Sequence, residues 1–300
     1  MGRIFKIALA LFLIGVGIVA AFAALSDEPI FASIFNTVNE DDFEYNELVY
    51  DADEFTNFEF NFENRDFIIR PSTDGSIKIT YYTTEKDVVY AILDGDTLDL
   101  TNEVEWLNNW FMGFNFAVND DFYDVYVYLP ATIAYDLKID TSNGTLDMND
   151  IDNVETLDFD TSNGNITIDN VSVQSMIFDT SNGAIRLTDV TIVGDLEADT
   201  SNGRIYLTNV VVDNIDCYTS NGRIIGVNVD CDSIKLRTSN GSIELELAAD
   251  KADYEVKMST SNGDLTYDGI GVTSERFNEG AQYLADLHTS NGDITIDFTE

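Results

Sequence analysis

The tetrapeptide Thr-Ser-Asn-Gly occurs eight times between residues 141 and 292 of this 300-residue chain. Successive copies are separated by 20, 19, 20, 19, 19, 22 and 29 residues, and they begin at Thr141, Thr161, Thr180, Thr200, Thr219, Thr238, Thr260 and Thr289. A period close to 20 residues is typical of repeat architectures, in which each repeat buries its apolar face against its neighbours. A catalytic loop is needed only once, so the repetition points first to architecture.

Apolar and polar positions alternate on both sides of the motif. Two residues after the glycine every copy has Leu or Ile, from Leu146 to Ile294, and two residues before the threonine every copy is again apolar, as at Phe159. This period of two is that of a half-buried strand. Each repeat is therefore predicted to be a strand, a Ser-Asn-Gly corner and a second strand.

A second corner is predicted six residues after the glycine, where Asp or Asn precedes Val or Ile, as in Asp150-Ile151 and Asn170-Val171. Such coils, stacked about 4.8 Å apart, predict an all-β fold, a single-stranded parallel β-solenoid of ~20-residue coils. An antiparallel hairpin array is the alternative, because it would use the same Asn-Gly turns, but it gives the second corner no role.

Asn and Gly suit the first corner because they tolerate left-handed backbone angles. Identical Asn side chains on stacked coils can also hydrogen-bond to one another as a ladder. The predicted structural corners are Asn143-Gly144, Asn163-Gly164, Asn182-Gly183, Asn202-Gly203, Asn221-Gly222, Asn240-Gly241, Asn262-Gly263 and Asn291-Gly292.

The N-terminus differs from the rest of the chain. Arg3 and Lys6 precede Ile7–Leu25, a stretch without any charge. A spanning helix needs about 20 apolar residues, whereas the apolar part of a cleaved signal has roughly 7–15. Residues 1–26 are therefore predicted to be a retained single-pass anchor in the cell membrane, with the rest of the chain on the extracytoplasmic side. Secretion after cleavage near Ala21-Phe22-Ala23 is the alternative.

Three further segments are predicted after the anchor. Residues 27–54, which are strongly acidic, read as a stalk, and residues 55–136 as an N-terminal β region. That region contains a degenerate repeat, Pro71–Thr80, and an aromatic stretch, Glu105–Phe116, that would cap the open end of the solenoid. Residues 137–300 hold the eight repeats, with a flap at Gly271–Leu287 inside the long last interval.

These features together resemble a known family. The hydrophobic anchor, the segment IIRPSTDGSIKITYY, a Trp-rich middle, the segment VYVYLP with YDLKIDTSNG, and the T-S-N-G units occur in this order. The set is similar to the putative-adhesin β-strand-repeat family of bacterial and archaeal envelope proteins, a domain of unknown function. From Phe55 onward, the resemblance implies an extracytoplasmic β-solenoid linked to the cell envelope and its stress responses. It implies no catalytic residues.

Composition excludes several classes of function. Asp and Glu number 55 against 15 Lys and Arg, for a net charge of −40, so nucleic acid and anionic lipid are not expected partners. Cys217 and Cys231 fall at inward positions and are predicted to be buried free thiols. His288 is the sole histidine, which argues against zinc sites built from His and Cys and against a His-dependent triad.

One acidic column is a candidate metal site. Asp140, Asp160, Asp179 and Asp199 each precede the Thr of a corner and are predicted to point outward, about 4.8 Å apart. Like charges at this distance repel by about 0.9 kcal/mol per pair even in water. Calcium bridging adjacent carboxylates would offset the repulsion. Hydrogen bonds from the N–H groups of each corner, or screening by salt, are the alternatives; no other cofactor is expected.

A basic cluster is a candidate binding site for an anionic glycan. Arg186, Arg204 and Arg223 follow the corner in three consecutive coils, and Lys235 and Arg237 lie in the next. Arginine suits bidentate contacts with anions, although such residues also simply balance neighbouring acids.

The predicted function is that of a non-enzymatic, membrane-anchored β-solenoid with a structural, adhesive or stress-related role in the cell envelope. Cell-wall or surface polysaccharide, or envelope proteins, are the expected partners. A polysaccharide-binding or polysaccharide-cleaving β-helix protein is the alternative. Cleavage would require acids and bases converging in one groove, and the outward positions show no such cluster.

Overall fold

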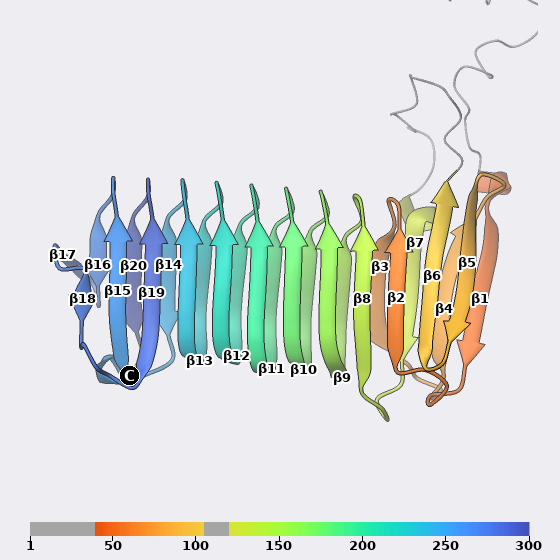
Figure 1. Cartoon of the computed structure of the whole chain (residues 1–300), viewed down its shortest axis with the longest axis horizontal. Helices are drawn as coiled ribbons and strands as arrows, with labels where there is room; N and C mark the ends of the chain where they lie inside the picture. Colours follow the sequence, from red (N-terminus) through yellow and green to blue (C-terminus); the bar gives the residue numbers. More distant parts are fainter. Residues whose placement is uncertain (1–39, 105–119, 300) are drawn as a thin grey trace, which may run out of the picture. The chain divides into compact units, whose positions relative to one another are not determined.

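A computed structural model describes residues 40–104 and 120–299, and these residues form an all-β structure (Figure 1). Helical elements in these ranges are limited to the 3-10 turns η1 (Glu40–Asp42), η2 (Asp120–Tyr123) and η3 (Lys251–Asp253). The strands are β1 (Glu44–Tyr50), β2 (Asn57–Phe62), β3 (Asp66–Pro71), β4 (Ile77–Thr83), β5 (Asp87–Asp94), β6 (Thr97–Val104), β7 (Asp124–Leu129), β8 (Tyr135–Thr141), β9 (Leu146–Thr161), β10 (Ile166–Thr180), β11 (Ile185–Thr200), β12 (Ile205–Thr219), β13 (Ile224–Thr238), β14 (Ile243–Leu247), β15 (Tyr254–Thr260), β16 (Leu265–Tyr267), β17 (Ile270–Val272), β18 (Arg276–Phe277), β19 (Tyr283–Thr289) and β20 (Ile294–Phe298).

Two of the predicted segments lie outside these ranges. They are the anchor at residues 1–26 and the aromatic stretch Glu105–Phe116. Within the described ranges, no helix is long and apolar enough to cross a membrane.

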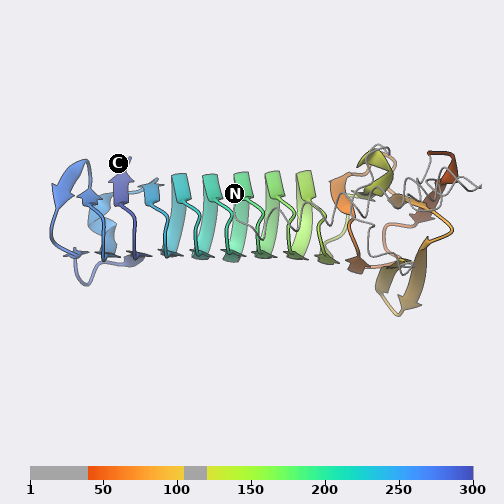
Figure 2. The same ribbon diagram turned by 90° about the horizontal axis from the view of Figure 1, so that it is seen from above.

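Strands β9 to β13 are the repeating coils. Each runs for 15 or 16 residues, from just after one Ser-Asn-Gly corner to the Thr of the next, and bends on the way. Each pairs in parallel with its neighbours, so that Ile166 lies between Leu146 and Ile185. Seen from above, the coils follow one another along the stack (Figure 2). The parallel solenoid is confirmed for the repeats, and the antiparallel hairpin array is wrong.

The alternation of buried and exposed residues changes phase within each coil. The inward residues of β10 are Ile166, Ile168, Val171, Val173, Met176, Phe178 and Thr180, all of them buried. The first change of phase falls at Asn170, which has a φ of 53°, and the second between Val173 and Met176, where the register with β11 shifts. Each aliphatic side chain buried in this way contributes about 1.5–3 kcal/mol, so stacking is driven mainly by the hydrophobic effect.

The second predicted corner is confirmed by its backbone angles. Asp150, Asp189, Asn209 and Asn228 have φ values of 59°, 53°, 53° and 55°. Asp and Asn enter the left-handed region more readily than other residues with side chains, because their short polar group can hydrogen-bond locally. This requirement explains why every complete coil has Asp or Asn at the bend.

At the N-terminal end, the order of strands in space differs from their order in the chain. Strand β2 pairs in parallel with both β6 and β8. Strand β3 pairs in parallel with both β7 and β9. The coil made of β2 and β3 comes first in the sequence, yet it lies between the pair β6 and β7 and the coil made of β8 and β9.

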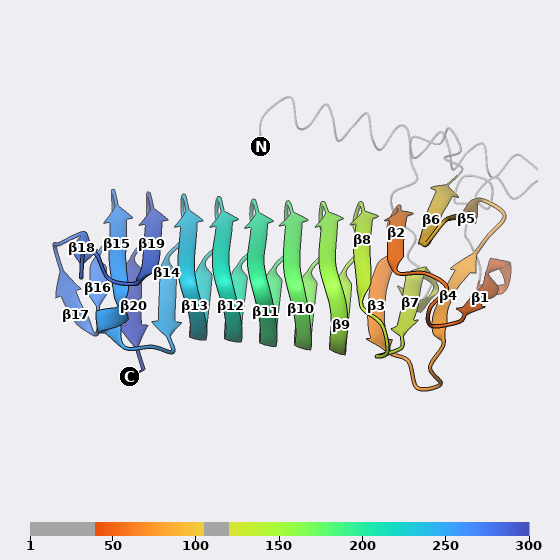
Figure 3. The ribbon, with the colours of Figure 1, turned by 60° about the horizontal axis from the view of Figure 1, so that its bottom comes forward.

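The same inversion occurs at the C-terminal end (Figure 3). Strand β19 pairs with β13 and β15, and β20 pairs with β14 and β16, all in parallel. The eighth repeat therefore lies between the sixth and the seventh. The long interval before it holds β17 and β18, which pair antiparallel with β16 and β15. The predicted flap, Gly271–Leu287, thus begins in β17 and overlaps β19.

Antiparallel strands also extend the N-terminal end. Strand β4 pairs with β7 and β1, and β5 pairs with β6. Two predictions need correction here. The segment Pro71–Thr80 is not a coil, because β4 runs antiparallel to its neighbours, although Ile77 and Ile79 are buried as expected. The predicted stalk, residues 27–54, extends too far, because residues 44–50 form β1.

Candidate functional site

The Thr of each corner joins two coils through its hydroxyl group. In the corner of β10, the N–H of Gly183 donates to Thr180 Oγ1 at 3.1 Å, and this hydroxyl donates to the carbonyl oxygen of Gly164 in the preceding coil at 3.2 Å. The same two bonds recur at Thr161, Thr200 and Thr219. These Thr side chains are buried. The hydroxyl thus pairs the Gly N–H of its own corner and the Gly carbonyl of the adjacent coil. Each of these groups would cost about 1–3 kcal/mol if it were buried without a partner.

The Gly of each corner is required by a close approach between coils. A Cβ atom on Gly203 would lie 1.6 Å from the carbonyl oxygen of Gly183, and one on Gly222 would lie 1.6 Å from that of Gly203. None of the Asn or Gly residues in the eight Thr-Ser-Asn-Gly corners has a positive φ. The prediction that these corners need left-handed angles is therefore wrong. Gly is needed because the backbone of the next coil occupies the position of a side chain.

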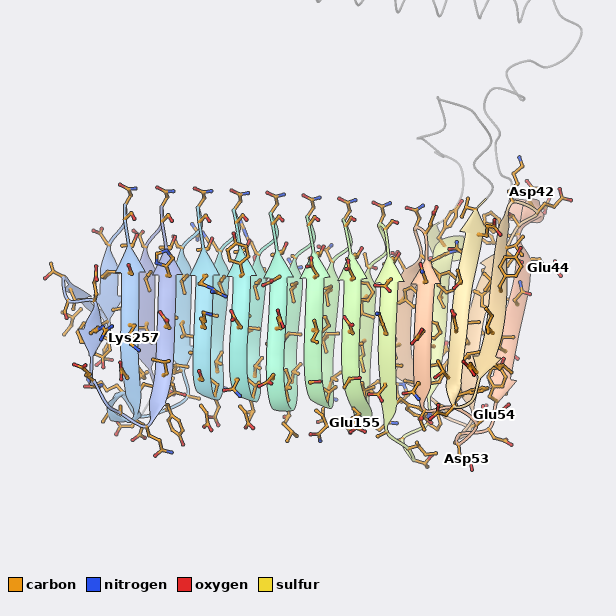
Figure 4. All side chains as sticks on the ribbon, in the orientation of Figure 1. Asp42, Glu44, Asp53, Glu54, Glu155 and Lys257 are labelled. Carbon is orange, nitrogen blue, oxygen red and sulfur yellow. The ribbon has the colours of Figure 1, made fainter. Side chains whose placement is uncertain are left out.

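The predicted Asn ladder is confirmed. Asn182 Nδ2 donates to Asn163 Oδ1 at 2.7 Å, and Asn202 Nδ2 donates to Asn182 Oδ1 at 2.7 Å. The ladder continues to Asn291 and ends at Asn262, following the order of coils in space. Figure 4 shows the row of side chains at the tips of the corners along one edge of the stack. The members of the Asn ladder are, in spatial order, Asn64, Asn143, Asn163, Asn182, Asn202, Asn221, Asn240, Asn291 and Asn262.

The first corner of the ladder has a different sequence, which sequence analysis missed. Asn64 joins the ladder, and Arg65 occupies the place of the corner Gly, where its carbonyl oxygen accepts from Thr141 Oγ1 at 3.3 Å. Its side chain is fully buried and pairs with Asp87. Asp87 also accepts from Asn102 Nδ2 at 2.8 Å. This buried network fixes β5 and β6 to the first corner. An Asn followed by Arg between two alternating segments was the available signal.

The four aspartates form the predicted outward column. Asp160 lies between Asp140 and Asp179 in the parallel register, and Asp179 lies beside Asp199. Among the described residues, no group of three or more His, Cys, Asp or Glu side chains is arranged to hold a metal ion. The alternative that each Asp accepts from its own corner is wrong, because the corner Gly N–H donates to Thr and the corner Asn N–H, as at Asn182 and Asn202, donates to a Ser carbonyl of the neighbouring coil. Calcium binding by the column stays a prediction.

The environment of the column raises the pKa of some of its carboxyl groups. Partial burial raises the pKa of Asp160, and the neighbouring charges of Asp179 and Asp140 raise it further. Burial likewise raises the pKa of Asp199, together with the charge of Glu197. Ionisation of these carboxyl groups is therefore less favourable in the folded state than in the unfolded chain.

The five basic residues of the candidate glycan site lie on two different faces. Lys235 and Arg237 belong to the strand segment before the corner and both contact Asp216, at 3.3 and 2.8 Å. Lys235 lines a groove of about 320 Å³, and the same lining includes Asp195, Glu197 and Asp216. This surface is acidic, so Lys235 and Arg237 balance neighbouring carboxylates rather than extend an anion site.

Arg186, Arg204 and Arg223 do lie together, on the segment after the corner. Arg186 and Tyr206 are opposite each other in the register of β11 and β12. The Arg186 guanidinium carbon lies 4.9 Å from the centre of the Tyr206 ring, and Arg204 Nη1 donates to the Tyr206 hydroxyl at 3.2 Å. The bond from Arg204 lowers the pKa of Tyr206, and the charges of both arginines add to this effect. Three of the five basic residues therefore lie together, and anion binding by them stays a prediction.

Cys217 and Cys231 are buried free thiols, as predicted. Burial raises the pKa of both, that of Cys231 to about 12. A thiol that does not ionise is a poor nucleophile and a poor metal ligand, so these side chains act as core residues.

The fold and its corners define an all-β solenoid whose repeat motif joins successive coils. The chain belongs to the Toastrack DUF4097 family, whose sequence model matches residues 55–297. This confirms the family resemblance seen in the sequence. A comparison with curated protein sequences gave no match.

Several solved structures are similar to this chain. A putative adhesin from Bacteroides fragilis is 14% identical, with 85% of this chain and 97% of that chain covered and a TM-score of 0.48. A putative adhesin from Parabacteroides merdae is 12% identical, with 87% and 98% covered and a TM-score of 0.48. A putative lipid binding protein from Parabacteroides distasonis is 14% identical, with 87% and 98% covered and a TM-score of 0.43.

Replacing one corner glycine tests the close approach between coils. We expect Gly203→Ala to lower the free energy of unfolding by about 3 kcal/mol, because the backbone of the adjacent coil must shift to admit the Cβ atom. Gly271→Ala is the control, since no heavy atom lies within 4 Å of its Cβ position, and a change within about 0.5 kcal/mol is expected. Denaturant titration followed by circular dichroism measures both. Equal effects of the two substitutions would contradict the close approach.

The acidic column predicts how stability changes with pH. A carboxyl group whose pKa is raised by folding favours the folded state most when it is protonated, and this contribution is lost as pH rises through the folded pKa. In low salt with chelator, the thermal midpoint should therefore rise as pH falls from 7 towards about 4.5, just above the reference value for Asp. Asp160→Asn should raise the midpoint at pH 7 and reduce this pH response. Asp213→Asn, an exposed charge outside the column, should leave the response intact.

Substitutions in the aspartate column also distinguish charge repulsion from calcium binding. If the column binds calcium, chelator lowers the midpoint of the unaltered chain at pH 7, and the double variant Asp160→Asn with Asp179→Asn loses this response. A midpoint that falls steadily from pH 7 to 4.5 would contradict the repulsion.

Proposed function

We propose that this chain is a non-enzymatic module of the cell envelope, anchored in the membrane by its N-terminal segment and exposed on the extracytoplasmic side. Arg3 and Lys6 before the uncharged stretch Ile7–Leu25 support this orientation, because basic flanks stay in the cytoplasm. The remainder, which holds all 55 acidic residues against 13 Lys and Arg, then lies outside. Its role there is structural or adhesive.

The observation that carries this proposal is that the polar groups of the repeat motif join neighbouring coils. In each complete corner the Thr hydroxyl, the Asn amide and the Gly backbone bond or abut the neighbouring coil. The motif recurs because every coil needs a corner, and the polar groups of the motif are engaged in contacts between coils. An array of stacked coils offers extended lateral surfaces, which suits adhesion or a structural role.

Polysaccharide binding is a second candidate, favoured by the three arginines around Tyr206. It is compatible with the same location in the envelope. A role in envelope stress is also compatible with it, and genes for a sensor kinase and regulator beside the coding sequence would favour that role over adhesion.

The location is tested by expressing the full chain, tagged at its C-terminus, in a bacterial host. We expect the protein to stay in the membrane fraction after alkaline carbonate washing, to retain its N-terminal residues by mass spectrometry, and to be digested by protease added to spheroplasts. A variant lacking residues 1–26 should be soluble and protected from that protease. A shortened, soluble protein outside the cells would contradict the anchor and favour secretion, and a protease-resistant full-length protein would contradict the extracytoplasmic location.

A further inference from the structure

Three consecutive coils share an outward surface that carries no acidic side chain. It is formed by the segments that follow the corners in β11, β12 and β13, which pair side by side in register. We call it the Arg face. Its outward residues are Ala184, Arg186, Thr188, Arg204, Tyr206, Thr208, Arg223, Ile225 and Val227.

This composition contrasts with the rest of the chain, in which Asp and Glu outnumber Lys and Arg by 55 to 15. The equivalent segments on either side again carry acids, Asp169 in β10 and Glu244 in β14. One arginine of the Arg face forms an ion pair with these acids. Arg223 contacts Glu244 at 3.5 Å, and both side chains are about half exposed. An exposed pair of this kind adds little stability and exchanges readily with another anion.

The other two arginines are held by Tyr206 instead of by a carboxylate. Among the described residues, the contacts of Arg186 and Arg204 are the face of the Tyr206 ring and its hydroxyl. Both arginine side chains are exposed, so most of their N–H donors point to solvent. Arg204 and Arg223 also immediately precede the paired residues Ile205 and Ile224 of adjacent strands, which lie about 4.8 Å apart, so an anion between the two arginines would relieve their mutual repulsion.

We propose that the Arg face binds a short acidic oligosaccharide through its carboxylate or sulfate groups. The guanidinium groups offer paired donors that match such anions, and Thr188, Thr208 and the Tyr206 hydroxyl offer uncharged hydrogen-bonding groups of the kind that sugars use. This inference rests on the proposed extracytoplasmic location, because acidic glycans are encountered there.

The charge of the chain favours a small ligand over a large one. A second copy of the chain also carries −40, and nucleic acid is a dense polyanion, so long-range repulsion opposes the approach of either. A short oligosaccharide contacts the Arg face without overlapping the acidic surfaces around it.

The test measures binding by the purified full chain in uncharged detergent, using isothermal titration calorimetry at low and moderate salt. The probes are a hexamer of galacturonic acid, a heparin-derived hexasaccharide and, as the uncharged control, maltohexaose. We expect both acidic probes to bind and maltohexaose not to bind. Arg204→Gln should weaken binding on the order of tenfold, the effect of losing one charge-assisted hydrogen bond. The triple variant with Arg186→Gln and Arg223→Gln should abolish it.

Arg276→Gln is the matched control, because Arg276 is 62% exposed on β18, away from the Arg face, and its loss changes the net charge equally. Its affinity should match that of the unaltered chain, and circular dichroism should show that all variants stay folded. Equal weakening by Arg276→Gln, or unchanged affinity of the triple variant, would overturn the proposal. So would an arginine-dependent dimer in sedimentation without glycan binding, since the face would then serve self-association. Because binding is measured in vitro, its failure would leave the membrane topology to be judged separately.

Discussion

The close contact between successive corners is the constraint on which the rest of this structure depends. The carbonyl oxygen of each corner Gly lies where a Cβ atom of the next corner Gly would be, at 1.6–1.7 Å from Gly144 to Gly241. Only Gly permits this approach, and the approach brings the Thr hydroxyl within reach of the carbonyl of the adjacent coil. With the corners fixed in this way, equivalent residues come into register and the inward columns of Leu, Ile and Val stack into one continuous core. The uniform motif is therefore a consequence of backbone packing.

The sequence was sufficient to predict what depends on local pattern. The alternation around Leu146 and Phe159 predicted the inward columns, the period near 20 predicted the parallel stack, and Asp150 and Asn170 marked the second bend. The Asn ladder also followed from repetition alone. The reason for the corner Gly could not be predicted. A Gly required by contact with another coil looks the same in the sequence as a Gly required by a left-handed turn.

The inversions at both ends could not have been predicted from the repeat pattern. The seventh and eighth copies both have apolar inward residues, so the repeat pattern allows either to pair with the sixth; β17 and β18 then pair with the strands of the outer coil. Arg65 was missed for a similar reason, since its partner Asp87 is 22 residues away in a segment with no repeat. Among the candidate sites, the aspartate column was predicted correctly as a column. The five basic residues were divided, because Lys235 and Arg237 precede a corner whereas the three arginines follow one.

The corner also divides the outer surface into two chemically distinct faces. The segment before the corner carries the aspartate column in four coils, and the segment after the corner carries the Arg face in three coils. The Asp is not needed to form the corner, because the later copies replace it by Tyr218, Arg237, Ser259 and His288, and in each of them the Thr hydroxyl still donates to the Gly carbonyl of a neighbouring coil. Selective chemistry in this chain therefore belongs to the lateral faces, and the repeated tetrapeptide belongs to the framework.

Hydrogen exchange at the corner amides tests this account most directly. The N–H groups of Gly183, Gly203 and Gly222 donate to buried Thr hydroxyls at 3.0–3.1 Å. In the presence of chelator and without any ligand, these amides should exchange as slowly as the core strand amides of β11 and β12, because they open only when the coils separate. Rapid exchange at these glycines alongside slow exchange in the strands would contradict the claim that the corners hold the stack together.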